Sequence, residues 1–204
     1  VVPLRGLGPL RADVLLAVGD LHSQAGATQA AAKSYQRALG IARRTDDPVR
    51  EGHVLSQLAV VEQQVGQEEE ALRDALKAAE LLDGRDLRLH GVALANLGLI
   101  HRLHGQLDLA RSALRRAMAT LETAGDAADT AIALGTLANV LRDEGSYAES
   151  EKMLRQSLGL HRRVGNRRSE CVSLGNLGAL LLRLERYPEA ETALRTALEL
   201  AEEL

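Results

Sequence analysis

Apolar residues recur along this chain at the spacing of α-helices, in pairs of stretches that a glycine separates. In one such pair the apolar positions follow the i, i+3, i+4, i+7 spacing of one helix face. They are Ala93, Leu94, Leu97 and Ile100, then Ala110, Leu114, Ala117 and Leu121. Between the two stretches lies Gly105. Glycine ends helices because it adopts the left-handed backbone conformation without steric cost. Each pair therefore predicts two helices joined by a turn.

The helix pairs repeat with a period of about 40 residues. The separating glycines stand one period apart, to within a single position, at Gly26, Gly66, Gly105 and Gly145, and one further period lands on Glu185. The pattern predicts ten helices in five antiparallel hairpins, with no strand, and turns near these five positions. The expected repeats cover about 12–47, 48–86, 87–126, 127–166 and 167–204, with residues 1–11 as an N-terminal segment or the remnant of a preceding helix.

Breaks between the hairpins are also visible; they lie at Asp46-Asp47-Pro48, Asp83-Gly84, Gly125-Asp126 and Gly165-Asn166. Asp47 followed by Pro48 predicts a helix N-cap and a first helical residue, because an Asp side chain accepts backbone N–H groups and proline needs no helical N–H partner there. Glu185 replaces the turn glycine of the fifth repeat, so we expect it in a left-handed conformation at a cost of roughly 1 kcal/mol.

Small residues recur where the two helices of a hairpin must nearly touch. Seven residues before each turn position stand Gly19, Ala59, Gly98, Ala138 and Gly178, and five residues after it stand Ala31, Ala71, Ala110, Ser150 and Ala190. Facing small residues let two helices pack closely. A single hairpin cannot bury its apolar face alone, so neighbouring hairpins are expected to stack into an open solenoid with two faces.

Composition narrows the function classes. The chain is 46% hydrophobic and 26% charged, with a net charge of −3, three Tyr and no Phe or Trp. It therefore has neither a global basic field nor base-stacking platforms for nucleic acid. No apolar stretch approaches the roughly 20 residues that span a bilayer, and no signal peptide is recognisable. The single cysteine excludes an intrachain disulfide and favours a cytoplasmic location.

The repeated motif resembles the tetratricopeptide repeat. The residues that carry the resemblance in the third copy are Leu97-Gly98, Gly105, Ala110 and Ala117, and those in the fifth are Leu177-Gly178, Ala190 and Ala197. The long period is similar to the branch that includes kinesin light chains, Leu-Gly-Asn scaffolds and sensor arrays of bacterial regulators. The resemblance implies an all-α solenoid, a right-handed superhelix with a concave groove. The family's usual aromatics are missing, and Ala59, Glu62 and Glu185 depart from its motif.

The resemblance also implies where a ligand would lie, because in this family the first helix of every hairpin lines the groove. The groove-facing positions are occupied by Gln57, Asn96, Arg102, Thr136, Asn139, Arg142, Asn176 and Arg183. Asn and Gln can hold an extended peptide backbone because each offers a donor and an acceptor, and Arg recognises carboxylates. The alternative is that these residues are a solvated face, with Asn96 and Asn176 only capping or bridging adjacent repeats.

Arginines one period apart favour an acidic partner. Arg142 lies one period after Arg102, and Arg183 lies one residue beyond the next step. In a stacked solenoid such residues form a ladder along one face, beside an expected amide row of Asn96, Asn139 and Asn176. The alternative is an exposed row making weak surface pairs, for instance with Asp143 or Glu185.

The histidines raise a metal hypothesis at His101, His104 and Asp108, but His101 and His22 fall at an inter-helix packing position. We interpret them as packed side chains with one satisfied nitrogen, because no cluster reaches the usual three or four ligands. No phosphate-binding, zinc-protease or nucleophile-elbow motif is present. We therefore expect no metal, no cofactor and no enzyme activity.

Together these features predict a protein–protein interaction module that binds a peptide or partner helix in its groove. The Ala-, Leu- and Arg-rich composition suggests a GC-rich bacterial source, and we expect the chain to be the regulatory or sensor part of a larger signalling protein. The alternative is structural self-association, in which terminal repeats stack on neighbours to build a homo-oligomer, either a dimer or an array. We expect no nucleic acid and no membrane as partners.

Overall fold

The computed structural model describes residues 7–204; the first six residues of the expected N-terminal segment lie outside the described residues. This part of the chain contains no strand and forms ten helices: α1 (Leu7–Gln24), α2 (Thr28–Arg44), α3 (Pro48–Gln64), α4 (Glu68–Leu82), α5 (Leu87–Leu103), α6 (Leu107–Ala124), α7 (Ala127–Asp143), α8 (Tyr147–Val164), α9 (Arg167–Arg183) and α10 (Tyr187–Glu202). The predicted five hairpins and all-α solenoid are thereby confirmed.

The first helix begins earlier than the repeat pattern suggests. α1 begins at Leu7, inside the segment that we expected to precede the solenoid. Pro9 falls in its first turn. Proline is tolerated there because the first backbone N–H groups of a helix have no intrahelical partner.

The turns within the hairpins adopt the predicted left-handed conformation. Gly105, between α5 and α6, has φ of +72°, and the other three turn glycines are also positive. Glu185, between α9 and α10, has φ of +58° despite its side chain. The fifth hairpin therefore repeats the geometry of the other four with a residue that favours it less.

The odd-numbered helices from α3 onward start with a side-chain cap. Asp47 accepts a hydrogen bond from the backbone N–H of Arg50 at 2.9 Å, and Pro48 follows it as the first helical residue, as predicted. The equivalent caps at α5, α7 and α9 are made by Asp86, Asp126 and Asn166. Such caps satisfy backbone donors that would otherwise be unpaired, so they define where each hairpin begins.

Close helix contacts occur at the predicted small residues. A methyl group added at Gly98 would lie 2.6 Å from Cγ of Leu114 and 3.2 Å from the carbonyl oxygen of Ala110. A methyl group added at Gly178 would lie 2.5 Å from Cγ of Leu194. Only glycine, without a Cβ atom, lets α5 lie this close to α6 and α9 to α10.

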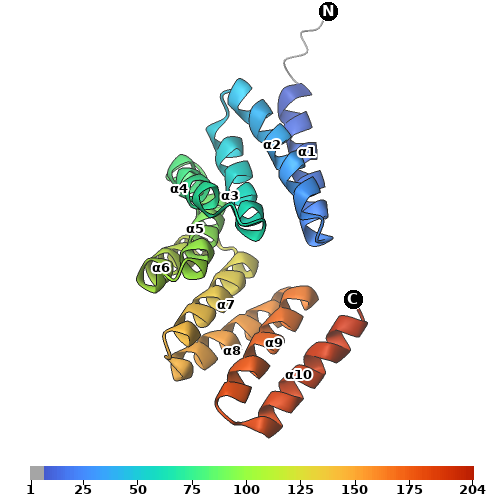
Figure 1. Ribbon diagram of the computed structural model, residues 1–204, viewed down its shortest axis with the longest axis vertical. Helices are drawn as coiled ribbons and strands as arrows, with labels where there is room; N and C mark the ends of the chain where they lie inside the picture. The colour runs from blue at the N-terminus through green and yellow to red at the C-terminus, as the bar shows by residue number, and fades with distance from the viewer. Residues whose placement is uncertain (1–6) are drawn as a thin grey trace, which may run out of the picture.

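The stack of hairpins is curved, with the odd-numbered helices on the inside. Neighbouring odd-numbered helices pack against one another along the chain, from α1 with α3 to α7 with α9, whereas in residues 7–204 no two even-numbered helices do so. Figure 1 shows α4 and α6 outside α3, α5 and α7, and the two ends of the curve on the same side. The ends touch where Arg168 donates to the carbonyl oxygen of Gln24 at 3.2 Å.

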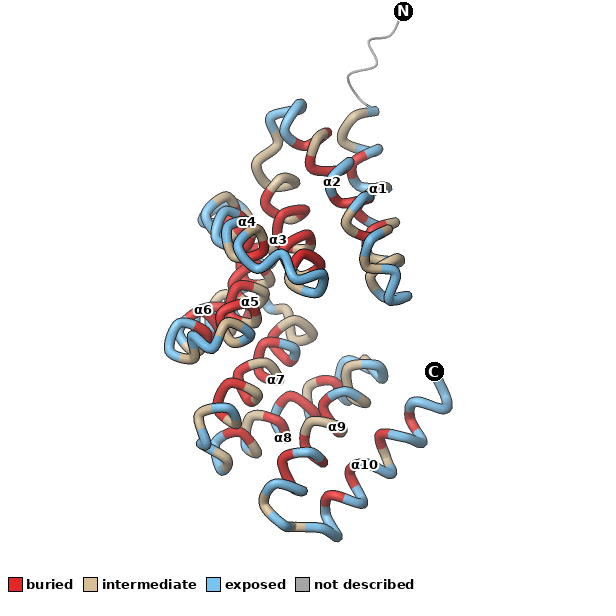
Figure 2. Tube along the Cα trace, in the orientation of Figure 1, coloured by how far each residue is buried: buried red, intermediate tan, exposed pale blue. Residues whose placement is uncertain are grey.

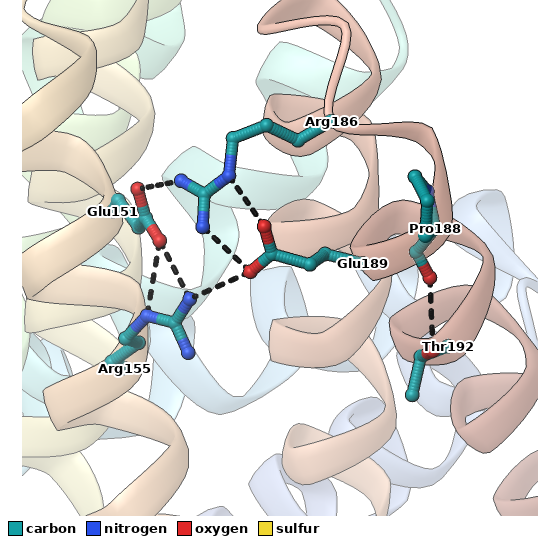
Figure 3. Close-up of polar contacts among 6 residues, drawn as sticks. All are labelled: Glu151, Arg155, Arg186, Pro188, Glu189 and Thr192. Carbon is teal, nitrogen blue, oxygen red and sulfur yellow. Dashed lines mark hydrogen bonds and ion pairs between the residues drawn. The ribbon is translucent and has the colours of Figure 1, made fainter.

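Charged side chains cross the gap between the outer helices. In Figure 3, Arg186 binds both Glu151 on α8 and Glu189 on α10, with N–O distances of 2.7 and 2.6 Å, and Arg155 binds Glu151 at 2.6 Å. The Thr192 hydroxyl beside this cluster donates to the carbonyl oxygen of Pro188 at 2.9 Å. Partly exposed pairs of this kind contribute little each, so they orient the outer helices more than they hold the stack together.

The core consists of a series of clusters, mostly of Leu, Ala, Val and Ile side chains, between the helices. Buried positions are most frequent on α3, α5 and α7, whereas α1 and α10 are largely exposed (Figure 2). This distribution follows from the stack, because each inner hairpin is covered by a neighbour on both sides.

Candidate functional site

The eight predicted groove residues all lie on odd-numbered helices, which line the inside of the curve. On α5, for example, the positions that remain partly exposed are Val92, Ala95, Asn96, Leu99 and Arg102, which follow the helical repeat, while the positions between them are buried. Because the odd-numbered helices line the inside of the curve, this stripe faces the concave side. Gln57 lies on the corresponding stripe of α3, half-buried.

Asn96 bridges two repeats. Its side-chain amide donates to the hydroxyl of Ser56 at 2.9 Å and to the Ser56 carbonyl oxygen at 3.2 Å, from α5 to α3. The bridging alternative considered for Asn96 is therefore what the structure shows. Thr136, and not Asn139, stands one period from both Asn96 and Asn176. The expected amide row is thus interrupted, with Asn139 about one helical turn further along α7.

The three arginines of the predicted ladder do not form one strip. Arg102 donates to Asp143 at 3.0 Å, and Arg142 approaches the other oxygen of the same carboxylate at 3.6 Å. Arg183 instead donates to the Tyr147 hydroxyl at 2.8 Å and lies 5.6 Å from the centre of that ring. Two arginines therefore share one carboxylate, and the third stacks on an aromatic ring of the preceding repeat.

A pocket of about 210 Å³ opens on the concave side between α7, α8 and α9. Its walls bring together three of the predicted residues: Thr136, Asn139 and Asn176. Its other polar lining residues include Ser157, His161 and Ser173, which were not predicted as site residues. Ser157 donates to the carbonyl oxygen of Ala131 at 2.7 Å and its hydroxyl lies 3.3 Å from that of Ser173.

The residues that sequence reasoning missed carry a signal in the repeat itself. Ser157 stands one period from Ala117 and Ala197, His161 one period from Leu121, and Ser173 one period from Ala133. Apolar residues at these positions pack the other hairpins, whereas here three polar ones are buried. Comparing equivalent positions on both helices of each repeat would have found them.

The histidines considered for metal binding have other partners. His101 Nδ1 lies 2.6 Å from the Gln106 side-chain oxygen, and His104 Nε2 lies 2.9 Å from that of Gln63. The interpretation of His101 as a packed side chain with one satisfied nitrogen is confirmed, since it is also buried. Residues 7–204 contain no group of three or more His, Cys, Asp or Glu side chains that could hold a metal ion.

None of the helices in the described part of the chain is both long and apolar enough to cross a membrane. Each helix has one face that packs against neighbouring helices, where its buried apolar side chains lie, and one face that is exposed.

Comparison with known proteins identifies the repeat. The tetratricopeptide repeat profile matches residues 51–123 and 129–203, and a second profile of the same repeat matches residues 14–49. No curated protein matches the chain in sequence. The resemblance found in the motif residues is therefore confirmed over nearly all of the described chain.

Solved structures share the arrangement. BtubC (BKLC) from P. vanneervenii superposes with a TM-score of 0.75 and 17% identity, over 96% of this chain and 81% of that chain. A Rap protein complexed with competence and sporulation factor gives 0.85 and 15% identity; 95% of this chain spans 55% of the Rap chain. A putative kinesin light chain from Podosopora anserina gives 0.68 and 16%, over 94% and 95%. Identities this low establish likeness of fold.

A buried carboxyl group lies at one of the motif departures. Glu62 on α3 is buried, and its Oε2 atom has no hydrogen-bond partner in residues 7–204. Burial raises the pKa of Glu62 to about 7, and the nearby Asp74 carboxylate adds to this rise in pKa. The next repeats carry His101 and Leu141 at the equivalent position, so the packing tolerates a neutral side chain here.

The raised pKa of Glu62 predicts a stability that falls with pH. Between the ordinary Glu pKa of 4.5 and about 7, the folded chain binds a proton that the unfolded chain has lost, so the free energy of unfolding decreases as pH rises through this window and levels off above it. Glu62→Gln should therefore be more stable than the native chain at pH 8, by about 3 kcal/mol at most, with little difference at pH 5.

Urea unfolding of both proteins at pH 5 and pH 8 measures this difference. Glu199→Gln, an exposed site on α10, is the matched control and should change nothing at either pH. A difference between Glu62→Gln and the native chain that is the same at both pH values would contradict the assignment.

Proposed function

Because this chain belongs to the tetratricopeptide repeat family, we propose that it is a protein-interaction module that binds an extended peptide, or a helix of a partner protein, along the concave side of α3, α5, α7 and α9. It acts as a binding scaffold and not as an enzyme. The observation that carries the proposal is the convergence of Thr136, Asn139 and Asn176 on one concave-side pocket.

The polar groups on this side suit a peptide. Amides and hydroxyls offer both donors and acceptors, which an extended backbone needs at every residue. The Rap protein, whose fold this chain shares, was solved in complex with competence and sporulation factor. That complex supports a binding role for the same fold here.

An acidic segment is the partner that the arginines favour. Arg102 and Arg142 share a single carboxylate, that of Asp143, so the three groups together keep one positive charge in excess. Such an excess steers a carboxylate-bearing peptide and sets its orientation. Asp143 already occupies the guanidinium groups, so it competes with any acidic ligand.

We place this module in the regulatory part of a larger bacterial signalling protein in the cytoplasm. The chain spans about half of the Rap chain that it matches, and 81% and 95% of the other two solved chains.

Because Asp143 competes with an acidic ligand for Arg102 and Arg142, removing the carboxylate and reversing the arginines should change the affinity for an acidic peptide in opposite directions. A fluorescent decapeptide of alternating Glu and Ala is the probe, and a Lys and Ala decapeptide is its charge-reversed control. Asp143→Asn should tighten Glu-peptide binding on the order of fivefold, the equivalent of about 1 kcal/mol, and Arg102→Glu combined with Arg142→Glu should abolish it. Fluorescence anisotropy measures both, with circular dichroism to verify the helical fold.

Added salt should weaken Glu-peptide binding to the native chain, and the Lys peptide should not bind. Glu-peptide affinity that is unchanged in both variants would place any acidic ligand away from Arg102 and Arg142.

A second candidate function is self-association, because both ends of the solenoid expose apolar side chains that inner repeats bury. On α10, Leu198 is 61% exposed, whereas the equivalent Leu158 on α8 is buried. On α1, Val14 and Leu21 are exposed, whereas Ala93 and Ile100, at the equivalent positions of α5, are fully buried. Stacking α1 of one copy on α10 of another would cover both faces in a head-to-tail array.

Light scattering over a range of concentrations tests the array. If the ends stack, the average mass of the native chain rises with concentration, and Val14→Glu or Leu198→Glu alone keeps the chain monomeric. Leu76→Glu, at another exposed leucine on the middle helix α4, is the control and should leave the association intact. A native chain that stays monomeric throughout would rule out self-association and leave the peptide-binding proposal unaffected.

A further inference from the structure

The pocket between α7, α8 and α9 is a polar site within an apolar stack. Its floor is formed by Ser157, His161 and Ser173, at positions where other repeats carry Ala, Val or Leu. Burying polar groups destabilises a fold unless they are hydrogen-bonded. A hairpin that followed the repeat would fill this place with apolar side chains, so the packing of the stack does not account for these three residues.

Two residues that line the pocket each carry a side-chain atom with no hydrogen-bond partner in residues 7–204. These atoms are Nδ1 of His161, whose side chain is on α8, and Oδ1 of Asn139, on α7. Both atoms are buried, and His161 as a residue is 2% exposed. Leaving such atoms unpaired destabilises the fold. A ligand in the pocket that turned both side chains toward itself and bonded to both atoms would recover this loss on binding.

The site favours a ligand without charge. The lining residues include no Asp, Glu, Lys or Arg. Burial lowers the pKa of His161, which keeps its ring neutral at physiological pH, although Glu170 on α9 opposes the shift. Glu170 itself is paired with Arg162 of α8 at 2.7 Å. A charged ligand would lose its hydration here without meeting an opposite charge.

The pocket has the size and the opening for one side chain. Its volume of about 210 Å³ is below the roughly 300 Å³ at which pockets for drug-sized ligands begin. Ile132 and Val172 form an exposed apolar rim, on the concave stripes of α7 and α9. A peptide that follows the concave side would pass over this rim and insert one residue.

We propose that this pocket binds the carboxamide of an Asn or Gln side chain from a bound peptide, with Asn139 Oδ1 accepting from its N–H and His161 Nδ1 pairing with its other polar atom. A carboxamide fits because it carries its donor and its acceptor on two separate atoms, and can therefore serve partners on two different helices. The assignment deepens the proposed peptide-binding function and rests on it for its biological ligand.

Capped single amino acids test the pocket without any partner protein. N-acetyl glutamine N-methylamide is titrated into isotope-labelled protein, with the glutamate and methionine analogues as charged and apolar matches of similar length. Nuclear magnetic resonance follows the His161 ring and the Asn139 side-chain amide. We expect saturable shifts of both with the glutamine probe, in the millimolar range, and none with the other two.

His161→Leu should abolish the shift at Asn139 and raise the melting temperature, because Leu121 fills the equivalent position of the preceding repeat. His101→Leu, which installs the residue found at the equivalent Leu141, is the matched control and should retain the Asn139 shift. Equal shifts with all three probes, no saturable shift with glutamine because the pocket holds only water, or a shift that survives His161→Leu would each overturn the assignment. The capped amino acids do not need the peptide groove to bind. A negative result with them would therefore leave the acidic-peptide proposal to be decided by its own binding test.

Discussion

The structure depends on the close approach of the two helices within each hairpin. At Gly98 the helix α5 lies so near α6 that even a methyl group would collide with Leu114. Comparable contacts at Gly19 and Gly178 repeat this geometry at both ends of the stack. The two helices of each hairpin thus bury apolar side chains between them. The apolar side chains that remain on the outside of the hairpin must be buried against the neighbouring hairpin. Neighbouring odd-numbered helices pack closely, whereas within residues 7–204 the backbones of even-numbered helices stay apart, and α8 reaches α10 through the ion pair of Arg155 with Glu189. The hairpins therefore fan outward and the stack curves.

The curvature determines which residues meet, and so where binding chemistry can arise. Side chains one period apart become neighbours across the inner surface, as the hydrogen bonds from Asn96 to Ser56 show. Most such contacts join neighbouring repeats. The carboxylate of Asp143 likewise forms ion pairs with both Arg102 and Arg142. The pocket beside Asn139 differs, because two of its lining residues, Asn139 and His161, each carry a buried polar atom without a hydrogen-bond partner in residues 7–204. Departures from the repeat are therefore more informative about function than the repeat itself.

The sequence pattern predicted the fold because helix spacing, turn residues and small contact residues are all local and repeated five times. Even Glu185 could be expected in the left-handed region, since four glycines define what its position requires. The partners of individual side chains were harder to foresee. Whether Arg102 reaches Asp143 depends on the relative orientation of α5 and α7. The repeat length along the sequence does not specify that orientation. His161 was not predicted because the family resemblance places the groove on the first helix of each hairpin, whereas part of the pocket floor lies on the second helix, α8.

The most direct test of this account compares two glycines in unfolding experiments with urea. Gly98 lies at the α5–α6 contact, whereas Gly159 on α8 has no neighbour within 4 Å of where a Cβ atom would stand. If close helix approach holds the stack together, Gly98→Ala lowers the free energy of unfolding by about 1–3 kcal/mol because the added methyl group overpacks the contact. Gly159→Ala should raise it by up to about 1 kcal/mol, because alanine favours a helix. Equal stabilisation by both substitutions would contradict the account.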